Sequence, residues 1–559
     1  MVKSVIFVLA LALCSVQCKV ILKNEILPDI SSNLINKDDP KAIPAIHLEL
    51  PVYKDIIVNA NVSEKTEKEP GKKTNATSTT NESPKICQNN SDNISENLIN
   101  SDEILPCKIP KVDNGTALIL TPYIENGQIE EARQASRVNS EIFLGIESYS
   151  GFITVNKEYD SNMFFWYFPV LNKAVNETPW IVWLQGGPGA SSMTGLFDEI
   201  GPFKVSPGGT LKINTYTWLQ NHSLIFIDNP VGTGYSFTKH DDGFSKDMDS
   251  YGSNLYQTIH QFLKIFPELK SAPLYIAGES YAGKYVPVMA MHIHNHKNTP
   301  DSEINLQGII VGNPYIDPSM ISDITRSFYN FGLLNKEQIK IVEPLLKSFQ
   351  QDIATNNSAG AKNKWTSLIA VLLFLTHQKQ AYNFLKDDLL VGRYINFLKS
   401  SEVKRAIHVG DINFSFLNIT ANTKMSDDFL SSAKPYYEKL LDEQYKVLAY
   451  CGQLDQMLPC VHTFEQYRTW QWNGSSEFLE ATRYPYIFNA RLAGYHKTGG
   501  RLTEVVVRGA GHMVPMDEPA PTQTLVARWT HNKPLSRRFG VLEGSYLQEF
   551  VKNHSTVYL

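Results

Sequence analysis

The sequence predicts an α/β protein, in which a mixed and mainly parallel sheet carries helices on both faces. Short apolar segments of strand length recur along the chain, and several of them alternate with helical stretches such as 250–266. One of these apolar segments, 273–277, runs directly into a glycine-flanked serine, Ser280. A strand that turns sharply into a helix at a serine is a feature of one large group of α/β enzymes.

The expected strands are short and mostly buried. In chain order they are 163–170, 180–184, 223–228, 274–277, 306–312 and 445–450, followed by a β-branched strand at 505–507. The helical interval between 312 and 445 is far too long for a simple crossover. We therefore expect residues from roughly 316 to 440 to form a cap insertion over the active site, with a buried helix at 368–375 and an exposed loop at 355–364.

Three segments carry residues typical of acyl-transfer chemistry. The turn 278–283, Gly-Glu-Ser-Tyr-Ala-Gly, predicts a nucleophile elbow at Ser280, with Ala282 in a position that is often glycine. Asp455 follows the strand at 445–450, and His512 follows the strand at 505–507. The order Ser, Asp, His is that of the α/β-hydrolase fold and differs from the orders in chymotrypsin-like and subtilisin-like enzymes. A glycine-rich turn after the second strand, 185–189, can point backbone N–H groups at a developing oxyanion.

Several blocks resemble the signature blocks of the serine carboxypeptidases. They are 183–192, 228–236, 278–283 and 511–515, while 118–124 and 148–156 are similar to the vitellogenic and venom serine carboxypeptidase-like branch. The resemblance runs from about residue 118 to near the C-terminus. It implies that Ser280 attacks the last peptide bond, that His512 moves the proton and that Asp455 orients the imidazole. It also implies an oxyanion hole made by the N–H groups of Gly187 and Tyr281.

A carboxylate beside the nucleophile, Glu279, should repel a peptide's C-terminal carboxylate unless it is protonated. In similar enzymes a second glutamate matches Glu199 and shares a proton with the first. Because two touching carboxylates cannot easily both ionise, one pKa rises and its O–H can donate to the substrate, which favours acidic pH. The resemblance adds Trp183 and Gln185 to this carboxylate-binding network. Many relatives have asparagine at the position of Gln185. Because the glutamine side chain is longer, the resemblance does not determine which hydrogen bonds form in this pocket.

The N-terminus predicts a route through the secretory pathway. Residues 1–18 contain an early lysine and a short apolar run, which is typical of a signal peptide and too short for a membrane anchor. No other apolar stretch is long enough to span a membrane. Sequons are frequent, and the candidate glycosylation sites are Asn61, Asn75, Asn176, Asn221, Asn418 and Asn473.

Six cysteines are present, and two of them lie in the predicted signal peptide. The remaining four favour two disulfides, with shortest-loop pairings Cys87–Cys107 and Cys451–Cys460, although other pairings stay open. The second pair brackets Asp455. Ala190 replaces a cysteine found in many relatives, so one disulfide of those relatives must be absent. No histidine pair lies at ligand spacing near the cysteines, and we expect neither a metal nor a cofactor.

Residues 19–113 are poor in aromatics and rich in polar residues. Such a segment cannot bury enough surface to offset its conformational entropy, so we interpret it as a largely disordered or glycosylated extension, with a removed propeptide as the alternative. The catalytic domain is expected at 114–559. Its 42% hydrophobic content suffices for a sizeable core, and a net charge of −5 over 559 residues does not indicate a nucleic-acid partner.

These observations predict a serine carboxypeptidase that acts on peptide or protein C-termini and is secreted or lysosomal. Two alternatives remain: an acyltransferase of the same fold and a non-catalytic secreted glycoprotein. The sequence leaves the oligomeric state open, including a homodimer.

Overall fold

The structure is a computed structural model that describes residues 114–299 and 303–535. The predicted signal peptide, the extension up to residue 113, Cys87, Cys107, Asn61 and Asn75 lie outside these ranges.

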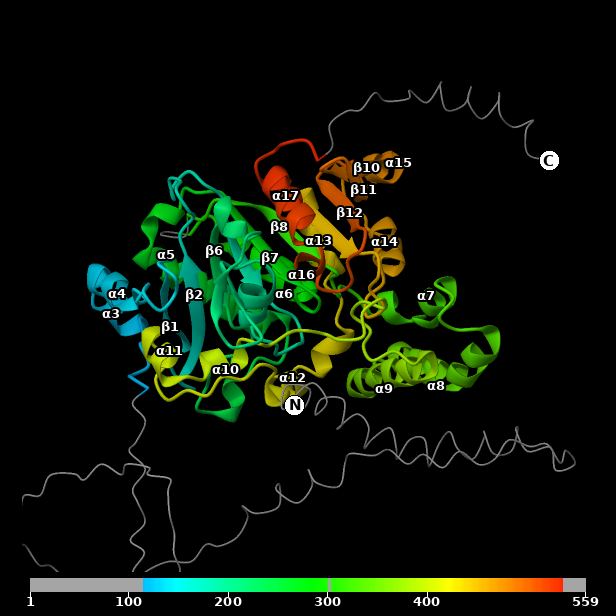
Figure 1. The fold of residues 1–559 in the computed structure, drawn as a ribbon, viewed down its shortest axis with the longest axis horizontal. Helices are drawn as coiled ribbons and strands as arrows, with labels where there is room; N and C mark the ends of the chain where they lie inside the picture. Colours follow the sequence, from blue (N-terminus) through cyan, green and yellow to red (C-terminus); the bar gives the residue numbers. More distant parts are fainter. Residues whose placement is uncertain (1–113, 300–302, 536–559) are drawn as a thin grey trace, which may run out of the picture. The chain divides into compact units, whose positions relative to one another are not determined.

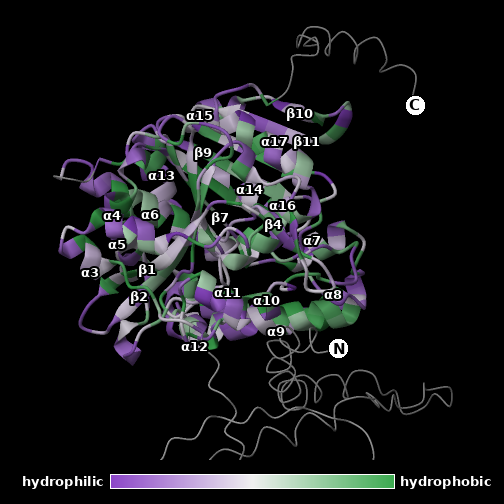
Figure 2. Ribbon diagram, turned by 60° about the vertical axis from the view of Figure 1, so that its left-hand side comes forward, coloured by the Kyte–Doolittle hydropathy of each residue, from purple (hydrophilic) through white to green (hydrophobic). Residues whose placement is uncertain are grey.

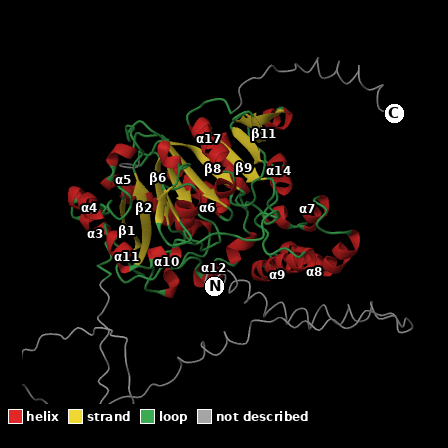
Figure 3. Cartoon of the chain, viewed as in Figure 1, coloured by secondary structure: helices red, strands yellow, loops and turns green. Residues whose placement is uncertain are grey.

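A ten-stranded sheet organises the described chain, in the order β1-β2-β6-β3-β7-β8-β9-β12-β11-β10. The six strands from β6 to β12 in this order pair in parallel, and the pairs at both ends are antiparallel. The predicted mixed, mainly parallel sheet is therefore confirmed (Figure 3). The strands are β1 (Tyr149–Asn156), β2 (Ser161–Phe168), β3 (Trp180–Leu184), β6 (Ser223–Ile227), β7 (Leu274–Glu279), β8 (Leu306–Gly312), β9 (Lys446–Gly452), β10 (Arg483–Phe488), β11 (Arg491–Gly499) and β12 (Leu502–Val507); β4 (Phe203–Val205) and β5 (Leu211–Ile213) form a separate hairpin.

Sequence reasoning missed the hairpin strands β4 and β5 and, in the ten-stranded sheet, β1, β10 and β11, which lie toward its edges. β11 alternates between buried and exposed positions, and the first three residues of β10 are exposed. Neither strand therefore has the continuous apolar run that marks a strand buried on both faces.

Both faces of the central strands are buried. Along β3, Trp180, Val182 and Leu184 belong to one apolar cluster, and Ile181 and Trp183 belong to the other. This alternation is the period of two expected for a strand with core on both sides. The helices, which are labelled in Figure 1, follow the same division. Residues of α5 (Met248–Ile265), α6 (Ala282–His296) and α13 (Lys434–Asp442) belong to the first cluster, and residues of α10 (Ile395–Leu398), α11 (Ser401–Ala406) and α17 (Pro519–Thr530) belong to the second.

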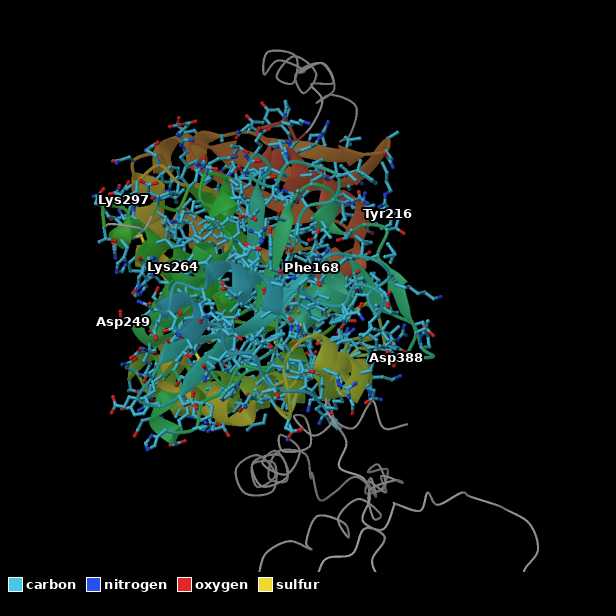
Figure 4. The ribbon with its side chains drawn as sticks, turned by 90° about the vertical axis from the view of Figure 1, so that its left-hand side faces the viewer. Phe168, Tyr216, Asp249, Lys264, Lys297 and Asp388 are labelled. Atoms are coloured by element: carbon cyan, nitrogen blue, oxygen red, sulfur yellow. A yellow bond between two sulfur atoms is a disulfide. The ribbon has the colours of Figure 1, made fainter. Side chains whose placement is uncertain are left out.

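Helix α5 corresponds to the predicted helix at 250–266 and shows why the sequence folds this way. Its first turn has a capping box, in which the Asp247 side chain accepts from the Ser250 N–H and the Ser250 hydroxyl accepts from the Asp247 N–H. One face is buried in the core, and the exposed side chains of Asp249 and Lys264 lie on the opposite face (Figure 4).

A helical insertion separates β8 from β9. It consists of η6 (Pro318–Ile321), α7 (Thr325–Asn330), α8 (Lys336–Ala354), α9 (Ser358–Thr376), α10, α11, α12 (Ile419–Lys424), η7 (Asp427–Leu430) and α13. Helices α8 and α9 pack side by side, and much of α9 is apolar and coloured green in Figure 2. The remaining helical elements are α3 (Thr121–Glu125), α4 (Ile129–Ser136), η2 (Gly195–Glu199), η3 (Trp218–Gln220), η4 (Asp241–Gly243), η5 (Pro267–Leu269), α14 (Cys460–Arg468), α15 (Ser475–Glu480) and α16 (Val514–Asp517).

The predicted exposed loop at 355–364 is wrong beyond residue 357. Helix α9 already begins at Ser358, because the Asn357 side chain accepts a hydrogen bond from the Gly360 N–H and caps the helix. Ser358 and Ala361 are buried against the rest of the insertion. The polar, small-residue composition that indicated a loop thus belongs to a capped helix start. None of the helices in the described ranges is long and apolar enough to cross a membrane.

Candidate active site

The predicted catalytic residues gather at the carboxyl ends of the parallel strands. Residues 185–187 follow β3, Ser280 follows β7, Asn313 follows β8, Asp455 follows β9 and His512 lies shortly after β12. The carboxyl ends of parallel strands share one edge of a sheet, where α/β proteins place their ligand sites. Residues that are more than two hundred positions apart in sequence are brought together in this way.

Ser280 occupies a tight turn between β7 and α6. Its φ of 62° lies in the left-handed region, which a non-glycine residue adopts at a cost of about 1–3 kcal/mol. The Ser280 N–H donates to the Gly312 carbonyl at 3.0 Å, and the Tyr315 N–H donates to the Ser280 carbonyl at 2.8 Å, so both sides of the turn are anchored to the segment after β8. A Cβ added at Gly278 would lie 2.6 Å from the Leu184 carbonyl oxygen and 2.7 Å from the Ala282 Cβ. The small residues of the turn are therefore required by close packing of helix against strand.

Asp455 and His512 form a buried hydrogen-bonded pair. The His512 Nδ1 lies 2.7 Å from the Asp455 Oδ2, and both side chains are almost fully buried. The other carboxylate oxygen, Oδ1, accepts from the backbone N–H groups of Met457 at 2.7 Å and Leu458 at 3.1 Å. Because Asp455 accepts a hydrogen bond from the Nδ1–H of His512, the Nε2 of the imidazole is available for proton transfer. Ser280 and His512 line the same cavity.

Asn313 is a site residue that sequence reasoning missed. Its Nδ2 donates to the Asp455 Oδ2 at 2.6 Å, the same oxygen that contacts His512, and its Oδ1 accepts from the Gly452 N–H at 3.1 Å. Asn313 is fully buried and has a φ of 40°. The available signal was an asparagine directly after a buried strand, at the edge where Ser280 and Asp455 were expected.

The insertion also contacts His512, the predicted catalytic histidine. The His512 N–H donates to the Tyr382 carbonyl at 2.6 Å, and the Tyr382 ring packs edge-on against the imidazole with centroids 4.9 Å apart. Asp517 ties the two segments together: its Oδ2 accepts from the Gly511 N–H and the Asn383 side chain, and its Oδ1 accepts from the Lys386 ammonium at 2.6 Å. The loop that carries His512 is thus held by residues of the insertion.

The predicted carboxylate-binding residues form a buried chain of hydrogen bonds. The Trp183 Nε1 donates to the Gln185 Oε1 at 3.0 Å, and the Gln185 Nε2 donates to the Glu279 Oε1 at 3.2 Å. The Gln185 amide therefore links the Trp183 indole to the Glu279 carboxyl. The sequence did not determine whether the longer glutamine could form the hydrogen bonds of this pocket, and the structure shows that it does. The Gln185 N–H is in turn held by the Ser192 hydroxyl at 3.1 Å.

Glu199 and Glu279 are both 1% exposed and interact with each other. With both groups ionised, the two Glu199 oxygens and the Glu279 Oε2 find no donor among the described residues. Burial first, and then the charge and hydrogen bond of Glu199, raise the pKa of Glu279 well above its usual range. Burial raises the pKa of Glu199 to about 7. One proton on the pair supplies the missing donor and removes the repulsion between two buried charges.

The glycine-rich loop after β3 passes directly over the elbow. A Cβ added at Gly186 would lie 2.5 Å from the Tyr281 nitrogen and 2.7 Å from the Glu279 carbonyl oxygen, so only glycine fits. Gly187 has a φ of 112°, which turns its peptide toward the same space. In the described part of the chain, no acceptor takes the backbone N–H of Gly187 or of Tyr281.

A cavity of about 320 Å³ contains these groups. Its lining includes Gln185, Glu279 and His512, and the insertion supplies a largely apolar wall that includes Tyr315, Trp365 and Phe416. The interval predicted to form a cap therefore contributes to the space in which a substrate would lie.

Cys451 and Cys460 form a disulfide across the segment that contains Asp455. Of the candidate glycosylation sites, Asn176 and Asn473 are exposed and Asn221 is half-buried. The Asn418 amide is occupied on both sides: Oδ1 caps α12 by accepting from the Ala421 N–H, and Nδ2 donates to the Gly232 carbonyl at 2.7 Å. Within residues 114–299 and 303–535, no group of three His, Cys, Asp or Glu side chains could hold a metal ion.

Comparison with known proteins agrees with this geometry. The family model described as serine carboxypeptidase matches residues 139–532. The chain is 39% identical to the vitellogenic carboxypeptidase of Aedes aegypti over 442 residues, which cover 76% of this chain and 92% of the relative. It is 38% identical to the venom serine carboxypeptidase of Apis mellifera, with 75% of this chain and 92% of the relative covered.

Among solved structures, the prohormone-processing carboxypeptidase Kex1 from Saccharomyces cerevisiae has the same fold. The TM-score is 0.64 at 24% identity, and the match covers 72% of this chain and 96% of that chain. At this identity the likeness concerns the fold alone. The family model and the two relatives, by contrast, extend over most of the described chain, and from them we conclude that the protein belongs to the serine carboxypeptidase family.

Proposed function

We propose that the protein releases C-terminal amino acids from peptides through an acyl-enzyme and that a protonated glutamate pair makes the reaction strongest at acidic pH. The observation that carries this proposal is the buried pair Glu279 and Glu199: Glu279 directly precedes Ser280 and lines the cavity that also contains His512, and Glu199 interacts with it from behind the lining. An ordinary serine hydrolase has no need of two carboxyl groups at that position. A peptide's terminal carboxylate needs a donor there.

The proposed acylation uses Ser280, His512 and Asp455. The Ser280 Oγ attacks the carbonyl carbon of the last peptide bond, and its proton passes to the His512 Nε2. The N–H groups of Gly187 and Tyr281 stabilise the oxyanion that forms. His512 then donates the proton to the leaving amino acid, and a water molecule attacks the ester to regenerate the free Ser280 hydroxyl.

Recognition of the terminal carboxylate depends on the proton held by Glu279 and Glu199. A neutral carboxyl can donate an O–H hydrogen bond to the substrate carboxylate, whereas two anions repel it. Trp183 and Gln185 fix one oxygen of Glu279, which leaves the other for the substrate. Asp455 and Asp517 also raise the pKa of Glu279, after burial and Glu199, and favour its neutral form.

We further propose that the chain passes through the secretory pathway. The signal-like residues 1–18, the exposed sequons at Asn176 and Asn473 and the disulfide Cys451–Cys460 support this route. The catalytic domain would then start near residue 114, and a second disulfide would join Cys87 to Cys107.

The decisive experiment replaces Ser280 with alanine. Loss of the nucleophile typically lowers the rate by about six orders of magnitude, and an active-site fluorophosphonate should label the parent protein and leave Ser280→Ala unlabelled. Release of free C-terminal amino acids by Ser280→Ala at more than about a thousandth of the parent rate would refute the proposed mechanism. Transfer of the acyl group to an added amine in strong preference to water would instead favour the acyltransferase alternative.

A further inference from the structure

Lys362 is the only lysine or arginine among the described residues that line the active-site cavity. It lies on α9 of the insertion and is half-buried. Trp365 and Thr366 of the same helix line the cavity beside it. The otherwise apolar wall of the insertion thus contains one cation.

The fold desolvates this cation without giving it a carboxylate partner. The Lys362 Nζ donates to the Asn422 carbonyl at 2.5 Å and to the Ser426 hydroxyl at 3.3 Å, which are both neutral groups. Asp428 is already engaged by Lys284 at 2.9 Å and by the Tyr281 hydroxyl at 2.6 Å. Burial lowers the pKa of Lys362 to about 8. A charge that is partly removed from water needs compensation, and an anionic substrate group would provide it.

The hydrogen bonds of Lys362 are with residues of the insertion, Asn422 and Ser426, and not with the predicted carboxylate-binding residues. Asn422 also donates from Nδ2 to the Pro188 carbonyl at 2.9 Å. Lys362 therefore belongs to the wall that the insertion supplies. Burial and then the charge of Glu279 raise the pKa of Tyr382, but the pKa of Lys362 responds only to burial and to Asp428.

We propose that Lys362 makes the enzyme select peptides whose penultimate residue is acidic. The leaving amino acid carries the terminal carboxylate and binds beside Glu279. The penultimate residue, which acylates Ser280, then lies against the wall that the insertion supplies, where its side-chain carboxylate meets the Lys362 ammonium. This inference rests on the proposed function and adds a substrate class to it.

The test uses peptides that differ only in the penultimate residue, with Glu, Gln or Lys at that position and leucine at the C-terminus. The parent enzyme should show a kcat/KM for the Glu peptide at least about tenfold above that for the Gln peptide, as expected for a hydrogen bond between charged groups. Lys362→Met should bring this ratio close to one, and Lys362→Arg should restore it. Lys362→Glu should reverse the preference toward the Lys peptide.

Lys347→Met is the matched control. Lys347 is an exposed lysine on the neighbouring helix α8, where it pairs with Glu343, and it does not line the cavity. This variant loses the same charge and should keep the parent's Glu to Gln ratio.

Two results would overturn the inference. One is a parent enzyme that cleaves Glu and Gln peptides equally, a result that requires no variant and is independent of folding. The other is a preference that survives in Lys362→Met, or that appears only when the acidic residue is at the C-terminus. A parent enzyme that cleaves none of the peptides would instead refute the proposed function itself.

Discussion

The proposed reaction needs a protonated glutamate pair, Glu199 and Glu279, and a neutral histidine, and these two requirements depend on pH in opposite directions. The pKa values of both carboxyls are raised above their usual range, so a proton is present on the pair at acidic pH and is lost as the pH rises through the raised pKa. The neutral form of a catalytic histidine, with an ordinary pKa of about 6.5, is instead favoured at higher pH. Peptide hydrolysis should therefore be strongest on the acidic side, while hydrolysis of a substrate with a blocked C-terminus should peak nearer neutrality.

The measurement is kcat/KM for a matched peptide and its C-terminal amide or ester from about pH 4 to about pH 8. Glu279→Gln should bring the two profiles together, because an amide donates a hydrogen bond at every pH. Coincident profiles for the parent enzyme would show that the glutamate pair does not recognise the C-terminus.

Asn313 should be a positioning residue for the triad, since it contacts Asp455 and lies outside the cavity lining. Asn313→Ala removes the donor to the Asp455 Oδ2 and leaves a buried carboxylate oxygen with one partner fewer. We expect kcat to fall about tenfold to a hundredfold, with little change in KM, because a lost hydrogen bond to a charged group amounts to roughly 1.5–3 kcal/mol.

A merely structural role of Asn313 would leave the pH profile unchanged. A looser Asp455 should instead shift the pH profile of kcat, and steady-state kinetics at several pH values would detect the shift. Unfolding in denaturant serves as the control, since a folded variant with parental kcat would refute the positioning role.

At the scale of elements, a fully buried ion pair joins α6, the helix that follows Ser280, to the insertion. The Lys284 ammonium on α6 contacts the Asp428 carboxylate of η7 at 2.9 Å, and the Tyr281 hydroxyl donates to the same carboxylate at 2.6 Å. Lys284 also donates to the Asp428 carbonyl. Burial raises the pKa of Asp428 and lowers that of Lys284, so desolvation opposes the pairing.

Removing one partner should destabilise the fold far more than removing both charges. Lys284→Met leaves a buried, uncompensated carboxylate and should lower the free energy of unfolding by about 3–5 kcal/mol. In the double variant Lys284→Met/Asp428→Asn the amide oxygen still accepts from Tyr281, and most of this loss should be recovered. Denaturant unfolding of the parent, both single variants and the double variant forms a complete cycle. A double variant that is less stable than Lys284→Met would contradict the prediction.

At the scale of the whole molecule, the buried acids should make the folded state more stable at acidic pH. Burial raises the pKa of Asp198 and of Glu199 to about 7, well above the values that these groups have in an unfolded chain. The native state therefore binds more protons than the unfolded state between these values. Stability from these groups is complete below their unfolded pKa and is lost as the pH rises through about 7.

Buried histidines such as His222, whose pKa burial lowers to about 3, act in the opposite direction in every variant. The contribution of the acids is therefore measured as a difference. Between about pH 5 and about pH 7.5 the unfolding temperature of the parent should fall relative to that of Glu199→Gln, which has no titrating group at this position, by at least about 2 °C. An unfolding temperature of the parent that does not fall relative to Glu199→Gln would refute this assignment of a raised pKa.

The central strands, the elbow at Ser280 and the segments that carry Asp455 and His512 could be predicted from sequence because each depends on a local pattern. An apolar run of strand length reports burial on both faces, and a serine between small residues reports a tight turn, whatever the rest of the chain does. Glu279 could be identified as unusual because it adjoins the nucleophile. The assignment of Glu199 required the resemblance to a family, since nothing local distinguishes it.

The contacts between distant segments were decided only by the tertiary structure. Asn313 meets Asp455 because β8 and β9 pair in parallel and end at the same edge, and Tyr382 meets His512 because the insertion folds back over that edge. The position of Lys362 in the cavity depends on how the insertion packs over the sheet edge. Sequence periodicity reports how each segment is buried, but it does not state which segments meet; the pairing of strands and the docking of helices determine that.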